Sequence, residues 1–240
     1  MRILSLHPGT TELVFSLGAG NLLVGRTDAC DYPESSQSLP SIGKQSDIKH
    51  ETVAVFEPDL VLLGHGQEEL AYSLASQFST MLLDPQSFDD LLAQVGKLGA
   101  QLTKQVEADI VVHELVTAME KVKAKIARFH AVRVHCDQEH KTLAPRLLND
   151  LVKFAGGEPY VGDSTIEALA KFDPQIIIAI TDDAKYLERI VSRDGWQVLS
   201  AVKSERVFMM SGSLLRPSPR LAKGMKRLAK RLHGVEVNGN

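Results

Sequence analysis

An internal repeat constrains the fold of this 240-residue chain more than any other feature of its sequence. Residues 51–58 read ETVAVFEP and residues 167–174 read EALAKFDP, so Glu, Ala, Phe and Pro recur at matching places. Each copy leads directly into an apolar run of strand length. Phe and Pro alone would suit any helix that enters a parallel strand, whereas the shared glutamate favours a true repeat. The sequence therefore predicts two related lobes, each made from about half of the chain.

Strand-like and helix-like segments alternate along both halves of the sequence. The candidate strands are the apolar segments 2–7, 59–63, 81–83, 132–135, 175–180 and 206–210. Helical patterns lie between them, and this alternation is typical of a mainly parallel sheet with helices on both faces. We therefore expect an α/β fold.

The middle of the chain predicts a long connecting helix. Residues 104–130 contain neither Pro nor Gly. At about 1.5 Å of rise per residue, a helix of this extent is roughly 40 Å long, which suits a rigid spacer between lobes. We predict an N-terminal α/β lobe over residues 1–102, a linking helix over 103–131 and a C-terminal α/β lobe over 132–240.

The overall charge and the apolar runs exclude several classes of partner. The formal net charge is −3, so the chain has no general electrostatic reason to bind nucleic acid, and we expect no such partner. The longest apolar runs have the length of a strand, far below the ~20 residues that cross a bilayer, so we do not expect a membrane-embedded protein. The basic run over residues 216–231 fits a solvated helix face better than an anion or membrane site.

Familiar catalytic motifs are missing from the sequence. It contains no dinucleotide-binding glycine motif, phosphate-binding loop, serine-nucleophile elbow or zinc-protease motif. These absences count against a nucleotide-dependent enzyme, a serine hydrolase of the usual type and a zinc protease of that motif, and they exclude none of them; we do not expect an enzyme. Cys30 and Cys136 are too few for a disulfide scaffold, and the sequence leaves open whether they pair.

Six segments of the sequence carry a family resemblance, at residues 2–12, 18–25, 30–33, 56–62, 155–157 and 216–220. Together they resemble the vitamin B12-type periplasmic binding proteins of ABC importers, the class that also handles haem and ferric siderophores. The resemblance implies a class III fold, with two Rossmann-like lobes of mainly parallel sheets joined by one long α-helix. It also implies limited hinge motion and a ligand held in the cleft between the lobes.

The same resemblance implies a function and a partner. The chain would be the solute-binding protein of an ABC-type importer and would bind a corrinoid or related metal chelate without changing it. No catalytic residue, resident cofactor or metal site is then expected. Glu51 and Glu167 stand where the family docks onto arginines of the dimeric permease, and a two-fold partner needs matched charges on both lobes. Alternatively, both glutamates are ordinary exposed acids at helix starts.

Candidate ligand contacts lie in loops that follow predicted strands. They are Pro8, Gly9, Thr10, Cys30, Asp31, Tyr32, Lys44, Gly64, His65, Glu139, His140, Ser213 and Arg216. Arg216 matches a family position that reaches the ligand, and Tyr32 either stacks on a macrocycle or packs a turn. We expect Cys30 to be a small buried thiol rather than a metal ligand.

The chain departs from the cobalamin binders in its aromatic residues. Those proteins sandwich the corrin between aromatic rings, and the matching positions here read Ala29, Lys44 (or Gly43) and Gly64. The segment after Cys136 is also shortened. Both differences allow a smaller or more polar ligand than cobalamin.

Two other functions stay open at the level of sequence. His7, His65 and either His135 or His140 follow strands near Asp137 and Glu139, which would suit an importer component for Zn²⁺ or Mn²⁺. A cytosolic corrinoid- or tetrapyrrole-handling factor or enzyme on the same scaffold is the other alternative. We expect a periplasmic or cell-surface protein if a leader has been removed, and a cytoplasmic one if Met1 is the native start. Oligomeric state is not predicted.

Overall fold

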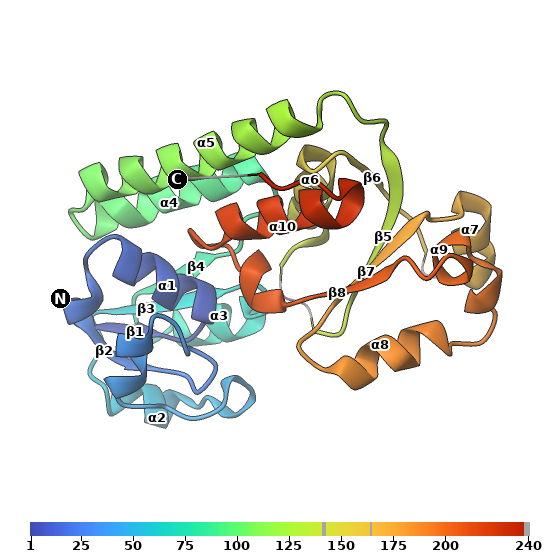
Figure 1. Cartoon of the computed structure of the whole chain (residues 1–240). Helices are drawn as coiled ribbons and strands as arrows, with labels where there is room; N and C mark the ends of the chain where they lie inside the picture. Colours follow the sequence, from blue (N-terminus) through green and yellow to red (C-terminus); the bar gives the residue numbers. More distant parts are fainter. Residues whose placement is uncertain (141–142, 164, 238–240) are drawn as a thin grey trace. The chain divides into compact units, whose positions relative to one another are not determined.

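Two α/β units, each built around a four-stranded parallel sheet, make up the computed structural model (Figure 1). It describes residues 1–140, 143–163 and 165–237. The first unit combines residues 1–115 with the short segment 216–219, and the second contains the rest of the chain. The predicted α/β fold with two parallel sheets is confirmed. The predicted limits of the two lobes stay predictions. Residues 216–219, the returning segment, belong to the first unit, and no division of the chain at a single point could assign them to it.

The first unit has the strand order β2-β1-β3-β4, and every neighbouring pair is parallel. Its strands are β1 (Ile3–Ser5), β2 (Leu23–Arg26), β3 (Leu60–Gly64) and β4 (Thr80–Leu83). Its helices are α1 (Pro8–Ser16), α2 (His50–Ala54), α3 (Glu68–Leu74) and α4 (Phe88–Gln101).

One face of this sheet packs on α2 and α3. Leu4 of β1 and Val61 and Leu63 of β3 form a buried cluster with Val53 and Leu74 of these helices. Alternate residues of a strand share a face, so the spacing of two in β3 places both side chains in this cluster. Because β3 is buried at all five positions, its other face is also covered. Such continuous burial is typical of a central strand in a parallel sheet.

The second unit repeats the arrangement with the order β6-β5-β7-β8, again all parallel. Its strands are β5 (Val132–Gln138), β6 (Gly157–Pro159), β7 (Ile176–Ile180) and β8 (Val207–Met210). Its helices are α6 (Pro145–Phe154), α7 (Ile166–Phe172), α8 (Ala184–Val191), α9 (Ser200–Lys203) and α10 (Leu221–His233).

The chain passes from the first unit to the second within one helix. This helix, α5 (Gln105–Ile126), has 22 residues, which corresponds to about 33 Å. It begins after Thr103, whose left-handed backbone (φ 57°) interrupts the helical path, and it ends before residue 127. One buried stripe follows it, at Ala108, Val111, Leu115, Ala118 and Val122. Among the described residues, no helix combines the length and apolar character that a membrane crossing needs.

The internal repeat extends to a shared hydrogen bond. Glu57 and Asp173, each directly before a proline, both have left-handed backbones, with φ of 44° and 50°. Nε of Arg2 donates to the carbonyl of Glu57 at 3.0 Å, and Nε of Arg133 donates to that of Asp173 at 2.9 Å. In both units, an arginine at the start of the first strand, directly before β1 or within β5, thus fixes the turn that leads into the neighbouring strand. The two units are related in detail, as the sequence repeat predicts.

The repeated glutamates occupy the same place in their helices. Glu51 and Glu167 are the second residues of α2 and α7, and both are exposed. Two positions later, Val53 and Leu169 are fully buried. Each helix therefore anchors an apolar side chain in its own core and presents a carboxylate to solvent.

Replacing Leu169 with alanine is expected to lower the free energy of unfolding by about 2–5 kcal/mol, because it leaves a cavity in a closed core. Glu167→Ala should change it by less than about 0.5 kcal/mol, because the side chain is exposed. The single tryptophan, Trp196, lies in the same buried cluster as Leu169, so its fluorescence during urea unfolding measures both effects. Equal midpoints for the two variants would contradict this placement of α7.

Candidate ligand-binding site

The carboxyl ends of the first unit's strands bring chemically active side chains to one edge of the sheet. His7 follows β1, His65 directly follows β3, and Asp84 directly follows β4. Ligands of open parallel sheets bind outside the carboxyl ends of the strands. This edge is therefore the first unit's candidate for a binding site.

His7 begins α1 as a neutral side chain. Its Nδ1 accepts a hydrogen bond from the Gly9 N–H at 3.1 Å, and Pro8 at the first helical position has no N–H to satisfy. Burial, with smaller contributions from the positive charges of Arg216 and His65, lowers the pKa of His7 to about 3. His7 therefore acts as a helix cap at neutral pH and supplies no positive charge.

The three predicted contacts that follow His7 are buried. Pro8, Gly9 and Thr10 all belong to the first turn of α1. The hydroxyl of Thr10 donates to the His7 carbonyl at 2.8 Å and lies 2.8 Å from Oγ of Ser5. These bonds stabilise the start of the helix, so the Thr10 hydroxyl is already engaged within the protein.

The lack of an aromatic side chain at the end of β3 has a steric cause. A Cβ added at Gly64 would lie 2.3 Å from Cγ of His7, which is closer than such atoms approach in proteins. His7 is held in place as a buried helix cap. Position 64 is therefore restricted to glycine while His7 stands beside it.

Arg216 is the centre of a buried ion pair. Its side chain is 15% exposed, and Nη1 lies 3.0 Å from Oε1 of Glu12, whose side chain is 2% exposed. The same Nη1 lies 2.7 Å from Oδ1 of Asp31, and Oγ of Ser218 donates to Oε2 of Glu12 at 2.6 Å. Burial opposes the charge on Arg216, but its bonds to Asp31 and Glu12 outweigh burial and raise its pKa. Arg216 thus anchors the returning segment to α1, and its contact with a ligand stays a prediction.

The long loop after β2 holds three more predicted contacts in different settings. Cys30 is fully buried with Sγ 3.2 Å from Oγ1 of Thr27, and burial raises the pKa of its thiol. Tyr32 is 45% exposed and Lys44 is exposed. Solvent reaches the Tyr32 ring and Lys44, whereas Cys30 is enclosed by protein. Both cysteines of the chain carry free thiols.

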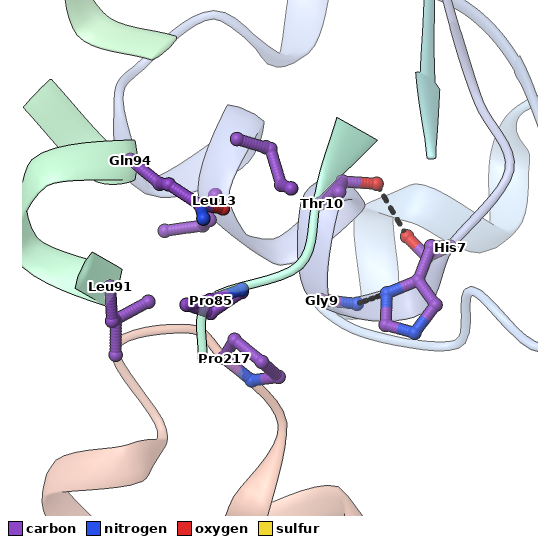
Figure 2. Close-up of a pocket in the computed structure, with 9 residues that line it drawn as sticks. His7, Gly9, Thr10, Leu13, Pro85, Leu91, Gln94 and Pro217 are labelled. Carbon is purple, nitrogen blue, oxygen red and sulfur yellow. Dashed lines mark hydrogen bonds between the residues drawn. The ribbon is translucent and has the colours of Figure 1, made fainter. Parts of the chain in front are cut away.

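A small cavity beside α1 is too small for the predicted ligands (Figure 2). Its volume is about 10 Å³, which suits a single water molecule. Small-molecule sites measure about 300–1,000 Å³. The cavity is lined by His7, Gly9, Thr10, Leu13, Leu83, Pro85, Leu91, Gln94 and Pro217.

In the second unit, Asp137 near the end of β5 organises a polar network. Both Nη atoms of Arg193 donate to its carboxylate, and so does the hydroxyl of Tyr186. Burial opposes the charge on Asp137, but Nε2 of His135, 3.8 Å away, and the hydrogen bonds from Arg193 and Tyr186 outweigh it and hold the pKa well below its usual range. The guanidinium of Arg193 also lies 4.7 Å from the ring centroid of Trp196, a favourable cation–π distance.

The remaining predicted contacts of the second unit have different surroundings. Glu139 accepts hydrogen bonds from Oγ1 of Thr181 and, at 2.8 Å, from Nη2 of Arg189. His140 is exposed, and Oγ of Ser213 accepts from Nη2 of Arg220 at 2.9 Å.

A hollow of about 350 Å³ in the second unit has the size of a small-molecule site. His135 in its wall is 6% exposed, and its Nε2 has no hydrogen-bond partner among the described residues. Burial raises the pKa of the neighbouring Cys136 thiol to about 12, so this thiol is protonated at neutral pH. The hollow is lined by Val134, His135, Cys136, Gln138, Pro145, Leu148, Asn149, Pro159, Tyr160, Val161 and Gly162.

Comparison with known proteins identifies the family. A family model described as periplasmic binding protein matches residues 3–136, more than half of the chain. The chain belongs to this family. The resemblance inferred from the sequence is thereby confirmed.

Relatives in this family include transport proteins of different bacteria. An uncharacterized ABC transporter substrate-binding lipoprotein of Bacillus subtilis, YvrC, is 25% identical over 253 residues, which cover 97% of this chain and 80% of the relative. The vitamin B12-binding protein of Yersinia pestis is 26% identical over 191 residues, covering 74% and 68%. The crystal structure of S. aureus IsdE complexed with heme has a TM-score of 0.83 at 19% identity, covering 97% and 98%, and shows the shared fold.

Three side chains of the candidate sites, those of Asp84, Arg193 and Glu12, were not predicted from the sequence. Asp84 directly follows a predicted strand, as His65 does, so its position next to His65 could have been inferred. Arg193 gave no signal, because it is 56 residues from Asp137 and lies beyond the end of α8. Glu12 was part of the family resemblance, but its partner 204 residues away was not visible.

Replacing Arg216 with methionine is expected to lower the free energy of unfolding by about 3–5 kcal/mol, because the buried carboxylate of Glu12 loses its guanidinium. Adding Glu12→Gln should restore most of this loss, since the amide carries no charge. Urea unfolding followed by far-UV circular dichroism measures both variants. A double variant no more stable than Arg216→Met alone would contradict the buried-charge explanation.

Proposed function

We propose that this chain is the solute-binding protein of an ABC-type importer and that it carries a metal chelate of the corrinoid, haem or siderophore class. The observation that carries the proposal is the family match, together with relatives named for ABC transport and vitamin B12 binding. The ligand would be held at the loops after the strands and released unchanged. Like its lipoprotein relative, the protein would act outside the cytoplasmic membrane.

The charged groups at the strand ends support binding rather than catalysis. Arg216 is paired with Glu12 and Asp31, and Arg193 is paired with Asp137. Arginines held in such pairs stabilise a fixed polar surface, whereas general acid–base chemistry needs a group that titrates near the working pH. We propose that the chain has no catalytic residue and no resident cofactor.

The steric restriction at Gly64 favours a ligand smaller or more polar than cobalamin. His7 prevents an aromatic side chain at this position, so a ring sandwich of the corrin-binding kind cannot be completed there. Tyr32, by contrast, exposes its ring and supplies an aromatic surface for stacking. Stacking of this kind contributes about 0.5–1.5 kcal/mol beyond the area buried.

Isothermal titration tests the ligand class. The protein is titrated with cyanocobalamin, cobinamide, haemin and a ferric hydroxamate chelate, and we expect 1:1 binding of at least one of them. Tyr32→Ala should weaken that binding roughly 10-fold. Tyr72→Ala is the matched control, because Tyr72 is 87% exposed on α3 and should leave affinity unchanged. No heat with any of the four, at concentrations that reveal micromolar binding, would overturn the proposed ligand class.

Glu51 and Glu167 are proposed to dock onto the permease. Their support is the repeat itself, which gives two exposed carboxylates at the same position of two equivalent helices. A protein with two related lobes can in this way present matched charges to a two-fold symmetric partner. Exposed charges of this kind contribute orientation and association rate more than affinity.

Neutralising both glutamates, Glu51→Gln with Glu167→Gln, is expected to leave ligand affinity unchanged and to abolish stimulation of the importer's ATPase in membrane vesicles. The matched control is Glu69→Gln with Glu158→Gln, which removes the same charge from one exposed glutamate in each unit. Stimulation that survives in the first pair, or is lost equally in the control pair, would contradict the docking assignment.

A further inference from the structure

Three potential metal ligands meet at the carboxyl edge of the first sheet. His65 directly follows β3, Asp84 directly follows β4, and Glu68 is the first residue of α3. Gly64 and Leu83 are paired in the parallel ladder, so the residues after them leave the sheet side by side. One ligand atom from each of the three side chains lies within 4.8 Å of the others.

The cluster places two carboxyl groups next to each other. Two like charges this close repel each other, and a cation bound between them would relieve the repulsion.

The cluster differs from the carboxylates of Glu12 and Asp137 because it has no arginine or lysine partner among the described residues. Glu12, which is buried in α1, and Asp137, which lies near the end of β5, are each paired with an arginine. Among the described residues, no lysine or arginine pairs with Glu68 or Asp84, and Asp84 is bonded instead to Nδ1 of His65 at 2.8 Å. One histidine nitrogen together with two carboxylates is a suitable ligand set for a divalent ion. The histidine alone cannot balance the two negative charges.

The local structure fixes the donors in place. Nε2 of Gln86 donates to Oδ2 of Asp84 at 2.8 Å, and the N–H of Gly66 donates to Oε1 of Glu68 at 3.2 Å. Outer hydrogen bonds of this kind orient metal ligands. Zn²⁺ binds imidazole nitrogen and carboxylate oxygen at about 2.0–2.2 Å, and in tetrahedral geometry such ligand atoms are roughly 3.3 Å apart. To meet this requirement, the hydrogen bond of 2.8 Å between Nδ1 of His65 and Oδ1 of Asp84 would have to open, and the wider separations, all within 4.8 Å, would have to shorten.

We propose that His65, Glu68 and Asp84 form a binding site for a divalent first-row transition-metal ion, with a fourth coordination position open to water or to an outside ligand. Three protein ligands with one open position are typical of exchangeable zinc sites. The site does not depend on the proposed transport of a chelate, because its donors all belong to this chain.

Metal-stripped full-length protein titrated with Zn²⁺ against a chromophoric chelator tests the proposal. We expect one ion per chain, and Co²⁺ should give the intense visible absorption of a four-coordinate site. Asp84→Asn and Glu68→Gln should each weaken binding by about 100-fold, since even the loss of an outer partner costs roughly 10–100-fold. Glu69→Gln is the matched control, because this neighbouring exposed glutamate lies outside the cluster.

His65→Ala is compared with His130→Ala, which removes an exposed histidine elsewhere. Circular dichroism and thermal unfolding establish that each variant is folded, and Glu68→Gln at an exposed position provides a variant with little risk to the fold. Binding that persists in Asp84→Asn and His65→Ala, or that falls equally in both controls, would overturn the site. These titrations use the bare ion, so failure to bind any chelate would leave their outcome unaffected.

Discussion

The buried pair of Glu12 and Arg216 is the interaction on which the first unit's ligand edge depends. It joins α1 to a segment that lies 204 residues later in the chain. A carboxylate that is almost fully enclosed is tolerable only with a hydrogen-bonded counter-charge. Because Glu12 and His7 are parts of one helix, the pair also fixes the histidine that occupies the space beside Gly64.

Both units contain buried or half-buried acidic side chains, and the protein compensates their negative charges in different ways. Arginines from distant segments neutralise Glu12 and Asp137, which makes these carboxylates part of the scaffold. Asp84 is bonded instead to His65 and Gln86, with the carboxyl group of Glu68 nearby, and no arginine or lysine pairs with it among the described residues. Most of these charges are therefore balanced within the protein itself.

The parts of the fold that depend on local pattern were predictable from the sequence. The repeat, the buried strands and the long helix follow from apolar spacing and from the positions of Pro and Gly. The candidate site was predictable only as a set of loops, because its pairs join residues far apart in sequence. The partners of Arg216 and Asp137 depend on how segments return to the sheet, which periodicity does not encode. The neighbours His65 and Asp84 are the exception, since both directly follow strands that pair in the sheet.

The chain crosses between its two units more than once, through α5 and again on either side of residues 216–219. The buried stripe of α5 is divided between them, with Leu115 in one and Ala118 in the other. Neither half of the gene therefore encodes a self-sufficient module. A chain truncated before residue 216 would lack part of its amino-terminal unit, although the cut lies a hundred residues beyond that unit's main segment. A deletion that begins before residue 216 and runs to the carboxyl terminus thus removes parts of both units at once.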